Sequence, residues 1–403
     1  MSPFTDNHPR AHQRDLFDVT SQPHHTHESW GDKMEAKDDR SLRLYFQNLN
    51  GLPTNDNWLE WNHIIQYVSD NNIDICGFAE PNVNWNKQLT ATALFHLRSH
   101  VKPAALQTAA CEEPTHYKYQ RGGVMMTTVG KMTGRIGHSG HDTLGLGRWV
   151  YTTYHGRNGI TLIIVTAYRV SQNHVTKGHH TAYNQQYRAL RRKGYDSPKP
   201  KQLFCTHLLP LVQEWERKNY EIILMLDANE ALDGPDFGRF LDQTALYDIL
   251  GHHHSVHSPP TYIRGSLTID FLLGTKNVLT ATKACGMTAF NDTILTDHRG
   301  LWADIDIPEL LKGSVPPPSR CMRIPLRTTQ KHRITKIRNR GIHLFNSLRI
   351  QQRLQDLKQS CYHQPKPITL QMLETIDSDI DSVLLDAIPQ TPPASPYWWS
   401  KEI

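Results

Sequence analysis

Short apolar runs, separated by polar segments that contain glycine, proline or asparagine, recur between residues 42 and 306. Runs of this kind bounded by turn-forming residues are typical of β-strands. They predict strands at 42–48, 73–79, 123–129, 149–154, 160–168, 221–227, 267–273 and near 299–305. The clearest strand pattern is the one at 221–227, EIILMLD.

Helical spacing occurs in two stretches between these strands. Trp58, Trp61, Ile65 and Val68 recur on one helical face, and a second helical stretch lies around 201–219. Many strands with a few interleaved helices predict an α/β sandwich, in which two mixed sheets pack together and helices lie outside them.

The flanking segments differ in composition from this region. Residues 1–40 are rich in His, Asp, Ser and Pro. They can bury too little apolar surface to offset their ordering entropy, so we expect a disordered tail. Three consecutive prolines indicate a linker at 309–326. Residues 327–403 predict a basic, partly helical C-terminal region, and the folded domain is therefore expected at 41–308.

Composition adds little on its own. The chain has 403 residues, a hydrophobic fraction of 38% and a formal net charge of +5. That charge is compatible with a polyanionic partner but does not require one. A basic run at 331–340 could bind nucleic acid or act as a nuclear address.

The six cysteines stand singly, and no two are close enough to form a CxxC pair, which disfavours a zinc ribbon or a redox motif. Scattered single cysteines are typical of a reducing compartment. No apolar run approaches the roughly 20 residues of a membrane span, and the N-terminus lacks the pattern of a secretory signal. We expect an intracellular, nuclear protein that does not bind membranes. The cysteines are Cys76, Cys111, Cys205, Cys285, Cys321 and Cys361.

Polar residues of catalytic type follow several predicted strands, where α/β proteins place their sites. A single such residue is more often a turn or cap residue, but six positions in order along one chain indicate a shared site. The residues are Asn48, Asn50, Glu80, Tyr168, Arg169, Asp227 and Asn229, with Asp270 inside the strand at 267–273 and Asp297 and His298 before the last strand.

These residue types fit a definite chemistry. Carboxylates and amides without a thiolate cluster favour a hard cation such as Mg²⁺, which can neutralise phosphate charge and stabilise a leaving oxyanion. A histidine beside carboxylates can donate to a phosphoryl oxygen. The chain contains no GxxxxGK[ST] after a predicted strand and no GxSxG elbow, which disfavours a P-loop nucleotide hydrolase and a serine hydrolase.

Seven segments within 42–306 together resemble the exonuclease–endonuclease–phosphatase superfamily. This group includes apurinic endonucleases, pancreatic deoxyribonuclease, inositol-polyphosphate phosphatases and the endonuclease domains of LINE-type non-LTR retrotransposons. The resemblance implies a DNase I-like fold, a four-layer α/β sandwich of two mixed β-sheets flanked by helices. The segments are QNLNGL (47–52), GFAEPN (77–82), RGGVMM (121–126), TAYR (166–169), LMLDANE (224–230), TYIRGSLTIDFLLGT (261–275) and TDHRGL (296–301).

The resemblance implies a metal site. Glu80 matches the principal metal-binding glutamate, Asn48 an asparagine that organises the metal and phosphate, and Asp297 the carboxylate before the essential histidine. Many apurinic endonucleases have an acidic residue where this chain has Asn50, so one charge is missing and metal affinity is expected to be weaker. The implied cofactor is Mg²⁺, with Mn²⁺ as the alternative.

The catalytic positions also match. Asp227 corresponds to the aspartate that orients or deprotonates the attacking water, and Asn229 to its phosphate-binding neighbour. Tyr168 matches a residue that contacts the scissile phosphate. His298 matches the essential histidine, whose partner carboxylate corresponds to Asp270. The implied reaction is in-line attack of water on a phosphodiester, leaving a 3′-hydroxyl.

Substrate contacts are expected from basic side chains and surface loops. The polar, aperiodic segments 96–120 and 171–200 are interpreted as insertions, and with 252–264 they are candidate loops for substrate selection. A basic run is usually a solvated face, but beside a nucleic-acid site it could contact phosphates. The candidate substrate-binding residues are Arg169, Arg188, Arg191 and Arg192.

Among superfamily members, TYIRGSLTIDFLLGT looks most like retroelement endonucleases, and the terminal PYWWSKEI is similar to their junction with reverse transcriptase. The resemblance therefore implies a DNA-nicking endonuclease whose product primes reverse transcription. Three alternatives stay open: a phosphatase of inositol phosphates or sphingolipids, a catalytically inactive domesticated nucleic-acid-binding protein, and an unrelated α/β protein whose aspartates merely cap turns.

A histidine cluster, His252, His253 and His254 with His257, suggests a second metal site. Consecutive histidines cannot all converge on one ion, so an exposed loop is expected there. Oligomeric state is not indicated by the sequence.

Overall fold

The computed structural model describes residues 28–55, 58–87, 89–113, 117–172, 174–175, 180–292, 294–313, 331–362, 372–373, 375–380 and 383. The chain divides into two compact units, Met1–Ser319 and Arg320–Ile403. The boundary between them falls inside the predicted linker.

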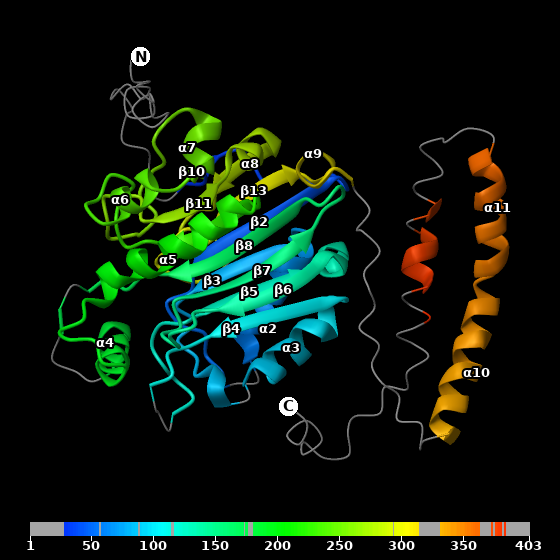
Figure 1. The fold of residues 1–403 in the computed structure, drawn as a ribbon, viewed down its shortest axis with the longest axis horizontal. Coiled ribbons are helices and arrows are strands. Elements are labelled where there is room, and N and C mark those ends of the chain that lie inside the picture. Colours follow the sequence, from blue (N-terminus) through cyan, green and yellow to red (C-terminus); the bar gives the residue numbers. More distant parts are fainter. Residues whose placement is uncertain are drawn as a thin grey trace, which may run out of the picture. The chain divides into compact units, whose positions relative to one another are not determined.

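Two mixed sheets form the first unit (Figure 1). In each, one strand pair is parallel and the others are antiparallel, and the parallel pairs are β2·β3 and β8·β9. The seven-stranded sheet has the order β1 (Trp30–Gly31), β12 (Thr282–Met287), β13 (Leu301–Asp306), β2 (Ser41–Asn48), β3 (Ile75–Ala79), β5 (Val124–Val129) and β4 (Ala104–Ala109). The six-stranded sheet has the order β10 (Tyr247–Asp248), β11 (Asp270–Gly274), β9 (Glu221–Asp227), β8 (Thr161–Tyr168), β7 (Trp149–His155) and β6 (Ile136–His141).

The inner faces of the two sheets pack against each other in one apolar core. Leu44 and Phe46 of β2 meet Ile164 of β8 and Met225 of β9 in this core. The sheets approach closely at Gly77 of β3, where a Cβ atom would lie 2.6 Å from both Met225 Cε and Thr166 Oγ1. Every residue of β2 is buried, because alternate side chains point into the inner core and into a second, outer one.

Helices cover the outer face of each sheet. On the seven-stranded sheet, Tyr45 and Phe78 pack with Trp61 of α2 (Leu59–Asp70) and Leu97 of α3 (Leu89–His100). On the six-stranded sheet, α5 (Pro200–Arg217) and α6 (Phe237–Asp242) supply the outer core (Figure 1). The four-layer α/β sandwich predicted from the sequence is therefore confirmed.

Shorter elements complete the first unit. The 3-10 helices are η2 (Trp85–Lys87) and η3 (Gly130–Arg135), and the remaining α-helices are α4 (Ala182–Arg192), α7 (Ile249–His254), α8 (Lys276–Ala281) and α9 (Ile307–Leu311).

All eight predicted strands are present, within a few residues of their expected bounds, and so are the two predicted helices. The interpretation of two segments as insertions is wrong in part: 96–120 contains the end of α3 and strand β4, and 171–200 contains α4. Of the loop expected at 252–264, the first three residues belong to α7.

The N-terminal expectation also needs correction. Residues 1–27 of the predicted disordered tail lie outside the described residues, but 28–40 belong to the fold. Trp30 pairs with Met287 in the sheet, and Lys37 Nζ lies 2.7 Å from Asp74 Oδ2. These residues are held by backbone pairing and polar contacts, which a composition poor in aliphatic side chains does not reveal.

In the second unit, α10 (Lys331–Ser347) and α11 (Ile350–Tyr362) agree with the partly helical region predicted at 327–403. Ile350, Leu357, Ile376 and Val383 form a small apolar cluster. The predicted linker at 309–326 starts too early, because α9 extends to Leu311. Of the helices in the described ranges, none combines the length and apolar character needed to cross a bilayer.

Candidate active site

Polar side chains from both sheets meet at one edge of the sandwich. In the parallel pair β2·β3, Asn48 is the register partner of Ala79, and Glu80 follows directly. In the parallel pair β8·β9, Tyr168 is the partner of Asp227. Because strands of a parallel pair end at the same sheet edge, the sequence positions that looked catalytic are brought together.

Asn48 links the two sheets at this edge. Its Nδ2 donates to Glu80 Oε1 at 3.1 Å and to Asp227 Oδ2 at 2.7 Å, while its Oδ1 accepts from the backbone N of Asn50 at 2.8 Å. Asn48 is 1% exposed, so its amide has no water to replace these partners. The amide thus fixes the separation of two carboxylates that come from different sheets.

His298 and Asp270 form a second pair beside this bridge. His298 Nδ1 lies 2.8 Å from Asp270 Oδ2. Burial disfavours the protonated imidazole, but the charge and hydrogen bond of Asp270, helped by Asp227 and Asp297, overcome it and raise the pKa of His298 to about 10. With Nδ1 occupied, Nε2 is the ring nitrogen left to meet a substrate.

Asp227 lies between these groups. One ligand atom each from Asp227, Asp270 and His298 lie within 4.8 Å of one another. Complete burial, then the neighbouring Asp270, hold the pKa of Asp227 well above its usual range, although His298 opposes this shift. Asp227 Oδ1 accepts from the backbone N of Asn229 at 3.0 Å, which orients the carboxylate.

Glu80 and Tyr168 form the other side of the cluster. Burial raises the pKa of Glu80, while hydrogen bonds from Asn48 and Tyr168 and the charge of His298 oppose that shift. Glu80 has a φ of 46°, a left-handed conformation that costs about 1–3 kcal/mol and is concentrated at functional sites. Burial and the Glu80 and Asp227 charges hold the pKa of Tyr168 well above its ordinary value, so its hydroxyl stays protonated.

The residues at this edge fit a hard divalent cation. Asn50 Nδ2 lies 3.2 and 3.3 Å from the two carboxylate oxygens of Asp297, and burial, with a smaller contribution from the Asp297 charge, raises the pKa of Glu80. The carboxylate oxygens of Glu80 and Asp297 and the amide oxygen of Asn50 are the kind of donors such an ion prefers. The buried Asp270 Oδ1 also has no hydrogen-bond partner among the described residues, as expected where a polar group awaits a ligand.

Arg169 corrects one of the predicted substrate contacts. Its side chain is completely buried and pairs with Glu230 and with Asp236, the latter at 3.2 Å. It also donates to the backbone oxygens of Ala228, at 3.0 Å, and Lys201, at 2.9 Å. Arg169 therefore stabilises the turn after β9 from the protein interior, and its guanidinium does not face a substrate.

The other predicted arginines lie on α4 and contact acidic residues. Arg188 and Arg192 both pair with Glu113, Arg188 at 2.7 Å, and Arg191 lies 3.1 Å from Asp196. These ion pairs connect α4 to Glu113 and to the segment that follows the helix. Contact of the three arginines with a substrate stays a prediction.

Four residues that the sequence did not single out lie in or around the site. Tyr262 stacks at a tilt on His298, with ring centroids 5.1 Å apart, and Gln47 Nε2 donates to the His298 carbonyl at 2.8 Å. Lys201 Nζ donates to the backbone oxygen of Asn229 at 3.0 Å. Arg121 lines a small pocket of about 60 Å³ together with Glu80 and Tyr168. Only Tyr262, Gln47 and Arg121 fall in segments that matched the superfamily, which gave them no role.

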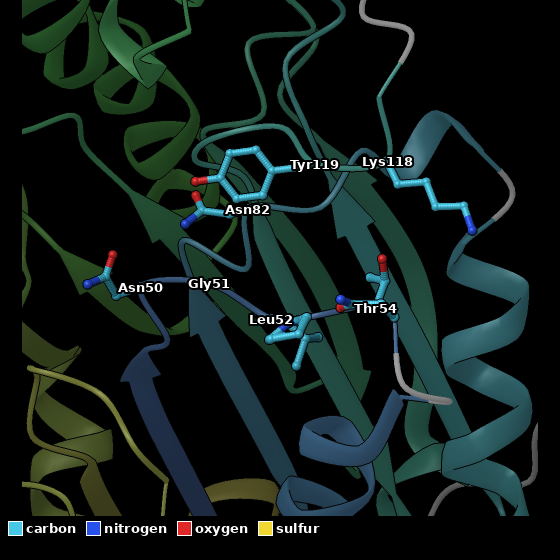
Figure 2. Close-up of a pocket in the computed structure, with 9 residues that line it drawn as sticks. Asn50, Gly51, Leu52, Thr54, Asn82, Lys118 and Tyr119 are labelled. Carbon is cyan, nitrogen blue, oxygen red and sulfur yellow. The ribbon is translucent and has the colours of Figure 1, made fainter.

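A larger pocket of about 620 Å³ adjoins the site at Asn50. Figure 2 shows Asn50 toward one side of this pocket and Lys118 toward the other, with the Tyr119 ring beside the Asn82 amide. Tyr119 is 54% exposed. The pocket therefore offers an aromatic face and a cation next to the carboxylate cluster.

No protein-family model and no curated protein matches this chain. Among solved structures it is similar to an AP endonuclease from Leishmania major (12% identity, 66% of this chain and 88% of that chain, TM-score 0.48). It is also similar to a 3′ phosphatase from Neisseria bound to a product DNA hairpin (16%, 66% and 99%, TM-score 0.46). A third is the endonuclease domain of TRAS1, a telomere-specific non-LTR retrotransposon (13%, 66% and 98%, TM-score 0.41). Identities and TM-scores this low support no inference about activity, so the proposed activity rests on the residues of this chain. The resemblance noted in the sequence is confirmed only at the level of the fold, by the two-sheet architecture.

Proposed function

We propose that this chain is a divalent-metal-dependent phosphodiesterase that cleaves DNA. The observation that carries the proposal is the Asn48 amide, which donates both to Glu80 and to Asp227 while the His298–Asp270 pair lies alongside. A carboxylate cluster for a cation and a positioned histidine are the two parts that phosphodiester hydrolysis requires.

Each residue has a role that follows from its environment. Asp227, with its raised pKa, is suited to orient a water molecule and accept its proton. His298, kept protonated by Asp270, donates to a phosphoryl oxygen where negative charge develops. Within this proposal Tyr168 and Asn229 contact the phosphate; Asn229 Nδ2 also donates to the Arg169 backbone oxygen at 2.7 Å.

Glu80 and Asp297 would hold the cation, and Asn50, whose Nδ2 contacts Asp297, would lie beside it. When bound, Mg²⁺ or Mn²⁺ supplies charge that neutralises the phosphate and stabilises the leaving oxygen. Asn50 contributes no charge of its own, so a relatively weak affinity for the cation is expected.

The choice of DNA is supported by the pocket at Asn50. Tyr119 offers an exposed ring on which a base can stack, and Lys118 offers a charge for a phosphate. Within this proposal the chain is the endonuclease of a non-LTR retroelement, acts in the nucleus, and leaves a 3′-hydroxyl that primes reverse transcription. The second candidate, an inositol phosphate or sphingolipid phosphatase, uses the same catalytic residues but has no need of a stacking ring.

A cleavage assay tests the proposal. The purified chain should nick supercoiled plasmid DNA only when Mg²⁺ or Mn²⁺ is present, and should release little phosphate from inositol phosphates. His298→Ala should reduce nicking by about 10²–10⁴-fold, the usual contribution of a general acid, with an unchanged circular-dichroism spectrum. Phosphate release without nicking would favour the phosphatase, and DNA binding without any hydrolysis would favour an inactive binding protein.

A further inference from the structure

A second cluster of metal-ligating side chains lies outside the candidate active site, at the edge of the seven-stranded sheet. It gathers Asp32 after β1, His253 and His254 at the end of α7, and Cys285 in β12. One ligand atom from each residue lies within 4.8 Å of all the others. The expectation that these histidines belong to an exposed loop is therefore wrong for His253 and His254, which converge with residues far away in the sequence.

We infer that Asp32, His253, His254 and Cys285 form a binding site for a zinc-type divalent ion that fastens the N-terminal strand β1 to the sheet edge. This inference does not depend on the proposed phosphodiesterase activity. Zinc accepts imidazole, thiolate and carboxylate ligands, whereas Mg²⁺ does not prefer the two imidazoles and the thiol of this set.

The separations suit a tetrahedral ion. Ligands at the usual zinc distances of about 2.0–2.3 Å lie roughly 3.3–3.8 Å from one another. His253 Nε2 is 3.2 Å from Asp32 Oδ2, Cys285 Sγ is 3.7 Å from His254 Nε2, and His254 Nε2 is 4.0 Å from Asp32 Oδ2. Small side-chain rotations would bring all four atoms onto one ion.

The backbone around the cluster is built for this close approach. Gly31 has a φ of +83°, and a Cβ atom there would lie 2.8 Å from both His254 Nε2 and the Cys285 carbonyl oxygen. The Cys285 backbone N donates to Asp32 Oδ2 at 3.0 Å. Glycine at position 31 thus allows strand β1 to carry Asp32 into the cluster, and the ligands are placed before an ion binds.

Access favours an ion over any larger occupant. The Cys285 side chain is fully buried, whereas the side chains of His253, His254 and Asp32 are 27%, 18% and 39% exposed. A thiol next to an imidazole can also act as a nucleophile, but no large substrate can reach this sulfur. A solvent ion can enter past the histidines. His254 Nε2 donates a hydrogen bond to the Cys285 carbonyl oxygen at 2.8 Å. An ion bound at Nε2 would replace the proton of this hydrogen bond.

Cobalt substitution tests the site in the full chain. After treatment with a chelator and its removal, Co²⁺ should produce the intense near-ultraviolet absorption of a thiolate–cobalt bond, and one equivalent of Zn²⁺ should abolish it. Cys285→Ser should eliminate the band. His253→Ala should weaken Co²⁺ and Zn²⁺ binding by at least about tenfold.

His252→Ala is the matched control, because His252 is exposed and lies one position from the cluster; its affinity should equal that of the unaltered chain. Glu80→Gln, in the candidate active site, should likewise leave the band in place. Absence of the band in the unaltered chain, or its persistence in Cys285→Ser, overturns the inference. If Cys285→Ser does not fold, equal affinities of His253→Ala and His252→Ala overturn it instead.

Discussion

Asp227 and Asp270 stand opposite each other as register partners, one at the end of β9 and the other at the start of the antiparallel strand β11. Asp270 also holds His298 Nδ1 at 2.8 Å. Two adjacent buried carboxylates repel each other, and the nearby positive charge of His298 relieves this repulsion. The register of one strand pair therefore positions both Asp227, the residue that we propose activates water, and Asp270, the partner of the histidine.

Asp270→Asn should lower Mg²⁺-dependent nicking by about 10³–10⁴-fold, because an amide neither stabilises the charged imidazole nor fixes its tautomer. Turnover under saturating substrate is the measurement. Asp248→Asn, which neutralises another buried carboxylate outside the site, is the control and should retain activity. Equal activity of both variants would contradict a role for Asp270.

Arg169→Met should destabilise the protein and should not simply weaken substrate binding. The substitution leaves Glu230 and Asp236 without their buried partner, and breaking such a pair costs about 3–5 kcal/mol. Urea unfolding gives the free energy of unfolding. Arg188→Met, which removes a partly exposed arginine, is the control and should change the free energy of unfolding by about 1 kcal/mol or less. An equally small change for Arg169→Met would contradict the structural role and favour Arg169 as a substrate contact.

Tyr119→Ala should raise KM for DNA by roughly 5–150-fold with little change in kcat, because one base–aromatic stacking contact contributes about 1–3 kcal/mol. Steady-state nicking of a short duplex measures both constants. Tyr119→Phe keeps the ring and should behave like the unaltered chain. If loss of the ring leaves KM unchanged, bases do not occupy the pocket at Asn50.

Asp248 predicts a pH dependence of stability. Burial, opposed by hydrogen bonds from the backbone of Gly251 and Leu250, raises the pKa of Asp248 to about 6. The folded state therefore keeps this proton longer than the unfolded state as pH rises. The stabilisation is complete below the unfolded pKa of about 3.9 and is lost as pH rises through 6.

Between pH 4 and 7.5 the free energy of unfolding of the unaltered chain should thus fall, relative to Asp248→Asn, by up to about 3 kcal/mol. Denaturant titrations of both proteins across this range make the comparison. A difference in the free energy of unfolding that stays constant with pH would show that the two backbone hydrogen bonds offset burial. A difference that grows with pH in favour of the unaltered chain would show that they outweigh it.

The sequence predicted the central strands because both of their faces are buried, which requires long apolar runs. It missed the edge strands β1, β4, β6 (IGHSGH) and β10, and also β12 (TKACGM). Strand β6 lies at a sheet edge and β12 next to one, where polar side chains are tolerated. The positions of the strand ends predicted that Asn48, Glu80 and Asp227 lie close together, and their hydrogen bonds agree, since a parallel pair ends at one edge whatever the loops contain.

Residues whose partners lie far away in sequence could not be assigned in the same way. Arg169 resembles a substrate contact locally, and only the positions of Glu230 and Asp236, more than 60 residues later, make it a structural residue. His253 and His254 resemble a solvated loop until Asp32 and Cys285 are placed beside them. No local pattern encodes either convergence.

The close contact at Gly77 links stability to turnover. Asn48 and Glu80 belong to one sheet and Asp227 to the other, so a wider gap between the sheets would stretch the hydrogen bond from Asn48 to Asp227. A methyl group at position 77 would push against Met225 and Thr166 from 2.6 Å. A substitution at this buried contact should therefore reduce the proposed activity while the protein is still folded, and the rate of DNA cleavage would then report on the distance between the two sheets.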